Sequence, residues 1–85
     1  MQSNEIITDL QLEKAFVGHN FDSYTAETRR KAIEQACLKV MNKFEPPHSL
    51  LFISKKLGLV HEDNYLTDLG RDFLYWSFRE DVPLL

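Results

Sequence analysis

Cysteine and glycine are scarce in this chain, and their scarcity excludes two kinds of site. The 85 residues include one cysteine, Cys37, so no disulfide can form within a single chain. A lone thiol is typical of a reducing compartment, and we expect the protein to be cytoplasmic. The three glycines, Gly18, Gly58 and Gly70, are too widely spaced to form a glycine-rich phosphate-binding loop.

Long apolar runs are missing as well. No segment approaches the ~20 apolar residues that span a bilayer. The N-terminal stretch "MQSNEIITDLQLEK" also lacks the basic start and apolar run of a secretory signal. We therefore expect a soluble protein that makes no membrane contact.

The three histidines and the cysteine do not have the paired spacing that a zinc site requires. Cys37 shares the helical register of Ile33 and Met41, which places it on an apolar face. A nucleophilic cysteine would need partial exposure and a neighbouring base instead. We expect no metal, no cofactor and no catalytic residue, and so a non-enzymatic protein.

The length favours a single domain that spans residues 1–85, because a chain this short has no room for a second core. Small domains bury a modest fraction of their surface. The six Phe, three Tyr and one Trp therefore either fill an aromatic core or cover surface that is shared with another subunit.

Apolar periodicity and end signals predict a mainly α fold with four helices. The expected helices cover about residues 4–17, 26–44, 47–57 and 68–79. Between the last two, "LVHEDNYLT" places two short apolar pieces around a turn-forming tetrad, which predicts a short β-hairpin.

Small polar residues stand at the expected N-termini of three helices: Ser3, either Ser23 or Thr25, and Thr67. Glycines end the first and third helices. The segment "EPPH" ends the second helix, because proline cannot continue a helix.

The second helix has the clearest amphipathic pattern. The apolar residues that recur in it at steps of three and four are Ile33, Ala36, Cys37, Val40, Met41 and Phe44. Charged residues occupy its other side, so we expect this helix to pack one face against the core.

Charge is divided unevenly along the chain. The net charge is −3, yet residues 28–60 hold seven basic residues against two acidic ones, a net charge of +5. The remaining residues have a net charge of −8. Such a split is either a solvated helix face or a surface for a polar partner such as DNA or an acidic protein.

If nucleic acid is the partner, the helices at about 26–44 and 47–57 would make the contacts. Ser49, Lys55 and Lys56 would face a groove. The phosphate contacts from the second helix would come from Arg29, Arg30 and Lys31.

The last helix is apolar on nearly all sides, which predicts burial of more than one face. A homodimer through this helix and the tail "VPLL" would provide that burial. The expected interface residues are Phe73, Leu74, Trp76, Phe78, Leu84 and Leu85.

Residues 49–76 resemble the C-terminal half of a winged-helix DNA-binding domain. The turn "LGLV" and the later segment "YLTDLGRDFL" fit the pattern in which a recognition helix, a hairpin and a final helix follow one another. Two features depart from it: only one helix fits before the turn, and the wing tip "HEDN" is acidic where phosphate contacts need Lys or Arg. The resemblance implies a truncated winged-helix-like fold.

The chain also resembles small uncharacterised accessory proteins of enterobacterial prophages. The segments that carry the likeness are "RRKAIEQACLKV", "PPHSLLFIS" and the ending around "LTDLGRDFL", which occur in that order. This resemblance implies a phage or bacterial origin.

These features predict a binding or regulatory protein that acts through protein–protein contacts, as a homodimer and with an unknown host or phage protein. The alternative is a nucleic-acid-binding regulator. A third version is an acidic inhibitor that occupies the basic DNA-binding site of its partner. Its surface would consist of Glu62, Asp63, Asp68, Asp72, Glu80 and Asp81. For Arg71, pairing with Asp68 or with the acidic turn is the expected use.

Overall fold

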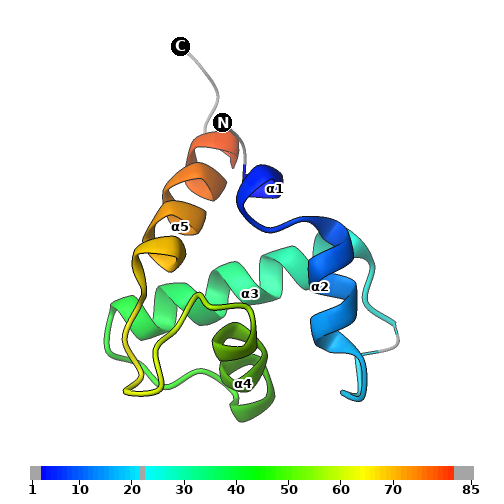
Figure 1. The fold of residues 1–85 in the computed structure, drawn as a ribbon, viewed down its shortest axis with the longest axis horizontal. Helices are drawn as coiled ribbons and strands as arrows, with labels where there is room; N and C mark the ends of the chain where they lie inside the picture. The colour runs from blue at the N-terminus through cyan, green and yellow to red at the C-terminus, as the bar shows by residue number, and fades with distance from the viewer. Residues whose placement is uncertain (1–2, 22, 82–85) are drawn as a thin grey trace.

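The computed structural model describes residues 3–21 and 23–81, and these residues form helices joined by short connections (Figure 1). The helices are α1 (Ser3–Ile6), α2 (Asp9–Phe16), α3 (Ala26–Met41), α4 (His48–Lys56) and α5 (Asp68–Asp81). Four of them have two turns or more, whereas α1 is a single turn. The prediction of a mainly α fold with four principal helices is confirmed.

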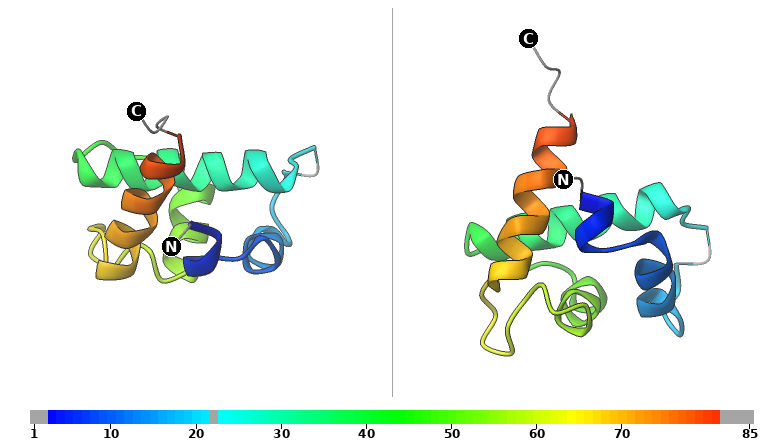
Figure 2. Two further views of the ribbon diagram at one scale, coloured as in Figure 1. Left: turned by 90° about the horizontal axis from the view of Figure 1, so that it is seen from above. Right: turned by 45° about the horizontal axis from the view of Figure 1, so that its top comes forward.

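Helix α3 runs across the molecule, and the other helices pack around it (Figure 1). Helices α2, α4 and α5 all contact α3, and α1 packs beside α5. The two further views show α5 rising from the C-terminal end of α3, while α2 lies near its N-terminal end (Figure 2). One core joins these elements, with Leu12, Ile33, Ile53 and Phe73 fully buried in it.

The expected first helix is broken into α1 and α2, which corrects the prediction of one helix over 4–17. Thr8 interrupts it by forming a capping box with Gln11. Its hydroxyl accepts the Gln11 N–H at 3.1 Å, and Gln11 Oε1 accepts the Thr8 N–H at 2.7 Å. These bonds satisfy two amides at the start of α2, so a new helix begins here. The Thr-x-x-Gln spacing in the sequence is itself a signal for the start of a helix.

Helix α3 begins as expected, after Thr25, which forms a capping box with Thr28. It ends at Met41, three residues before the predicted end at Phe44. Lys43 adopts a left-handed backbone conformation with φ of 63°. A residue in that conformation cannot continue a right-handed helix. The next helix, α4, agrees closely with the prediction of about 47–57.

The expected β-hairpin is not formed, because the described residues contain no β-strand. Val60 and Leu66 make a single antiparallel bridge, with Asn64 in a left-handed turn between them. Helix α4 has its left-handed Gly58 just before this segment, and Thr67 precedes α5 just after it, so neither strand can lengthen. A wing requires paired strands, and the winged-helix-like fold is therefore not supported.

Candidate binding surface at the end of α3

The arginines of α3 that were predicted to touch phosphates bind the protein's own backbone. Arg30 donates from Nη2 to the Ile7 carbonyl oxygen at 2.8 Å and to Asp9 Oδ1 at 2.7 Å. Arg29 donates to the Tyr24 carbonyl oxygen at 3.4 Å. These contacts fasten the segments on the N-terminal side to α3, so both arginines have structural roles.

The three lysines predicted to bind a nucleic acid or an acidic partner also have partners within the chain. Lys56 Nζ donates to the Ala15 carbonyl oxygen at 2.9 Å, near the C-terminus of α2, where a cation is favourable. Lys55 Nζ donates to the Glu62 carbonyl oxygen at 3.4 Å. Lys31 lies 3.7 Å from the buried carboxylate of Glu34. Ser49, the sixth residue predicted for a nucleic acid or acidic partner, is exposed on α4.

One face of helix α5 packs against the core, and this face contains two of the residues that were predicted for the dimer interface. Phe73 and Leu74 are 0% and 3% exposed, so both pack inside a single protomer. Trp76 is half-buried and Phe78 is 40% exposed, which leaves them accessible. Leu84 and Leu85 lie outside the described residues. The dimer stays a prediction, carried on this helix by Trp76 and Phe78.

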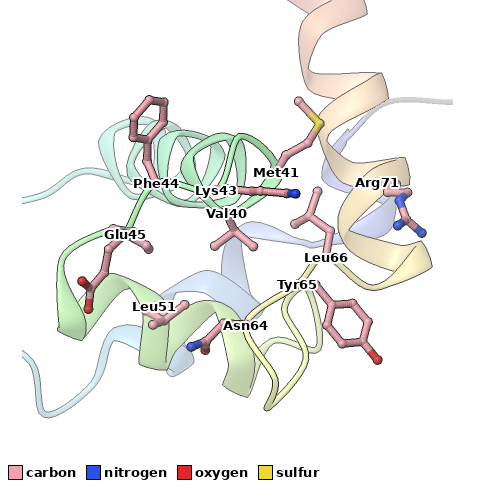
Figure 3. A pocket seen from close by; sticks show the side chains of 11 residues that line it. Val40, Met41, Lys43, Phe44, Glu45, Leu51, Asn64, Tyr65, Leu66 and Arg71 are labelled. Atoms are coloured by element: carbon pink, nitrogen blue, oxygen red, sulfur yellow. The ribbon is translucent and has the colours of Figure 1, made fainter.

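A hollow of about 590 Å³ opens where the C-terminal end of α3 meets α4, the turn before α5 and the start of α5 (Figure 3). Its apolar base includes the buried Val40 and Leu66 and the half-buried Leu51. The residues that line it are Val40, Met41, Lys43, Phe44, Glu45, Pro46, Leu51, Asn64, Tyr65, Leu66 and Arg71. The hollow is thus assembled from four separate stretches of the chain.

Large apolar side chains stand exposed around this hollow. Met41 and Tyr65 are each 50% exposed, and Phe44 is 69% exposed. Helical periodicity predicted that Met41 and Phe44 lie on the core face of one helix, and that prediction is wrong. Because α3 ends at Met41 and the backbone turns at Lys43, the helical register no longer applies to Phe44.

The acidic residues are spread over the turn and the outer side of α5. Glu62, Asp63, Asp68 and Asp72 are all exposed, and Asp68 also pairs with Arg71 at 3.2 Å. The prediction that Arg71 pairs with Asp68 is confirmed. The side chains of Glu80 and Asp81 lie outside the described part of the structure.

Cys37 lies in the core, as its register predicted. Burial raises the pKa of its thiol from 9.0 to about 12, and the charge of Glu34 adds to this rise. A hydrogen bond with Ser54 partly offsets both effects. A thiol that stays protonated is a poor nucleophile.

We expect Cys37 to resist alkylation by iodoacetamide at pH 8 in the native protein and to react rapidly once urea unfolds the chain.

The raised pKa of Cys37 also makes stability depend on pH, because the folded state holds the thiol proton more tightly than the unfolded state does. The resulting contribution to the free energy of unfolding is full below pH 9.0 and is lost as the pH rises toward about 12. Urea unfolding from pH 8 to 11 measures this loss, and Cys37→Ala should lose less stability over the same range. Equal loss in both proteins would contradict the assignment.

Across 3–21 and 23–81, no three His, Cys, Asp or Glu side chains are grouped so that they could hold a metal ion. No helix in the same residues has the length and apolar character needed to cross a membrane. Comparison with protein-family models, curated proteins and solved structures gives no match to this chain.

Proposed function

We propose that this chain is a non-enzymatic binding protein that holds a segment of another protein in the hollow at the end of α3. One observation carries the proposal: Met41, Phe44 and Tyr65 expose large apolar surfaces around a base that is itself apolar. Leaving such side chains in water costs free energy that a partner would recover by covering them.

The residue types around the hollow suit protein recognition. Aromatic residues and methionine are enriched in protein–protein interfaces, and aromatic side chains that enter a pocket often dominate the binding energy. Met41 adds a flexible side chain that adapts to different shapes. A hollow of about 590 Å³ has room for a few partner side chains.

The contacts of the basic residues favour this proposal over the nucleic-acid alternative. Arg30 and Lys56 would have to leave backbone carbonyl oxygens that they hold at 2.8 Å and 2.9 Å before they could bind phosphates. The exposed Glu62 and Asp63 in the turn would repel a phosphate backbone. Neither obstacle applies to an apolar segment of a protein at the hollow.

The proposal includes a homodimer and a phage or bacterial source. The accessible Trp76 and Phe78 on α5 provide a second apolar surface for another copy of the chain. The source rests on the prophage resemblance of the sequence. A host or phage protein would then be the partner at the hollow.

Selection from a random peptide library displayed on phage tests the proposed function. We expect wild-type protein to enrich peptides that Phe44→Ser and Tyr65→Ser bind at least about tenfold more weakly, since hot-spot aromatic residues have effects of this size. Fluorescence polarisation of labelled synthetic peptides measures the change.

Phe52→Ser is the matched control. Phe52 is also exposed, at 58%, but it lies on α4 and does not line the hollow. It should leave peptide binding unchanged. Failure to enrich any peptide, or equal losses for Phe44→Ser and Phe52→Ser, would count against the hollow as a binding site.

A further inference from the structure

Within residues 3–21 and 23–81, three helices are followed by a residue in the left-handed conformation, and one of these residues is not glycine. Gly18 follows α2 with φ of 87°, and Gly58 follows α4 with φ of 80°. Lys43 occupies the corresponding position after α3 with φ of 63°.

The ends of α3 and α4 have the same hydrogen-bond pattern, so Gly58 is an internal reference for Lys43. After α4, the Gly58 and Leu59 N–H groups donate to the carbonyls of Lys55 and Ser54, both at 3.0 Å. After α3, Lys43 and Phe44 donate in the same way to Val40 and Lys39, at 3.1 Å and 2.7 Å. Glycine is the usual residue at this position, because a side chain there is strained.

No polar contact of the Lys43 side chain within the described residues offsets this strain. The Lys43 side chain makes no hydrogen bond and no ion pair within the described residues. Residues held in strained backbone conformations cluster at functional sites. The strained residue here also lines the hollow.

The charges around the hollow show what the ammonium group could bind. Lys43 extends toward the side of the hollow where Arg71 lies, while the Glu45 carboxylate points away from it (Figure 3). The Arg71 guanidinium is already paired with Asp68 at 3.2 Å, and both side chains are exposed. An ammonium group next to an apolar base favours an anion that is attached to an apolar group.

We propose that the hollow binds a partner-protein segment in which a carboxylate stands beside a large apolar side chain, and that Lys43 recognises the carboxylate. This inference rests on the proposed function, because it names the chemistry of the segment that the hollow holds. The apolar side chain enters between Met41, Phe44 and Tyr65, and the carboxylate accepts a hydrogen bond from the Lys43 ammonium.

The experiment uses peptides enriched by wild-type protein in the library selection. Each is synthesised with its Asp and Glu residues and again with Asn and Gln in their place. We expect the acidic forms to bind about tenfold more tightly than the amide forms, the gain typical of one charge-assisted hydrogen bond at a partly exposed site. Lys43→Gly should lose that difference, and Lys43→Arg should keep it.

Thermal unfolding of the same variants separates binding from folding. Lys43→Gly should raise the unfolding midpoint by about 5 °C, because it removes the left-handed strain. A variant that is more stable and yet binds less tightly cannot owe its loss to unfolding. Lys39→Ala is the control for overall charge, since Lys39 is exposed and does not line the hollow.

Several outcomes would overturn the inference while leaving the proposed function intact. These are enrichment of peptides without acidic residues, equal binding of acidic and amide forms, or loss of the acidic preference in Lys39→Ala. A peptide with the sequence of residues 77–85 provides one more test. If it displaced the selected peptides as strongly as they displace one another, the inference would also be overturned, because the occupant of the hollow would then be a second copy of the chain. If no peptide is enriched at all, the proposed function itself fails.

Discussion

Replacing Gly70 with alanine is expected to lower the free energy of unfolding by about 3 kcal/mol or more, at the upper end of overpacking substitutions. The new Cβ would lie far inside van der Waals contact of the Leu59 carbonyl oxygen and 3.1 Å from Leu66 Cδ2. Urea unfolding followed by circular dichroism measures the loss.

The surroundings of Gly70 leave little room for relief. Leu59 is fully buried, and its carbonyl oxygen also accepts the Thr67 N–H at 3.0 Å. The Thr67 hydroxyl accepts the Gly70 N–H at 3.0 Å and donates to the Gly58 carbonyl oxygen at 2.6 Å. A shift of Leu59 away from the new methyl group would therefore disturb the hydrogen bonds that start α5.

Gly18→Ala is the matched control for Gly70→Ala. Gly18 has a left-handed φ of 87°, but no described residue other than its two chain neighbours has an atom within 4 Å of the position that its Cβ would occupy. Only conformational strain remains, and the expected cost is about 1 kcal/mol. Losses of similar size at the two positions would show that the chain around Leu59 can retreat.

The parts of the fold that depend on local chemistry could be predicted from the sequence. Thr25 caps the start of α3, and the buried position of Cys37 follows from its register in that helix. The break at Thr8 was missed, although its capping-box spacing with Gln11 is a local signal. The strand prediction failed because two helix ends limit the pairing to Val60 and Leu66.

The candidate site was harder to predict because it depends on contacts between distant segments. A charge count could not show that Arg30 binds the Ile7 carbonyl, which lies 23 positions away in the chain. Periodicity placed Phe44 in the core, since nothing in a lysine at position 43 signals a left-handed turn. Residues of the hollow as far apart as Val40 and Arg71 come together only through packing.

The second large effect is expected for Phe73→Ala, which should lower the free energy of unfolding by about 3–5 kcal/mol. Phe73 is 0% exposed and belongs to the core that joins α5 to the other helices. The loss combines two contributions: the favourable free energy of burying the deleted ring, and the cost of the cavity that remains in its place. A thermal melt should show a midpoint lower by more than about 12 °C.

Tyr75→Ala is the control on the same helix. Tyr75 is 53% exposed, and its ring contacts Trp76 and Arg79 on the outside of α5. Removing it should cost about 1 kcal/mol or less. Comparable losses for the two variants would contradict the inward orientation of Phe73.

Protein concentration distinguishes a core role of Phe73 from a role in a dimer interface. If the ring packs inside one protomer, the loss caused by Phe73→Ala is the same at two concentrations that differ by about a hundredfold. If the ring instead held two chains together, the difference between variant and wild type would change with concentration, because dimer stability depends on mass action. The burial of Phe73 predicts the first result, so Phe78→Ala, which alters an accessible ring, is the better variant for testing the dimer by light scattering.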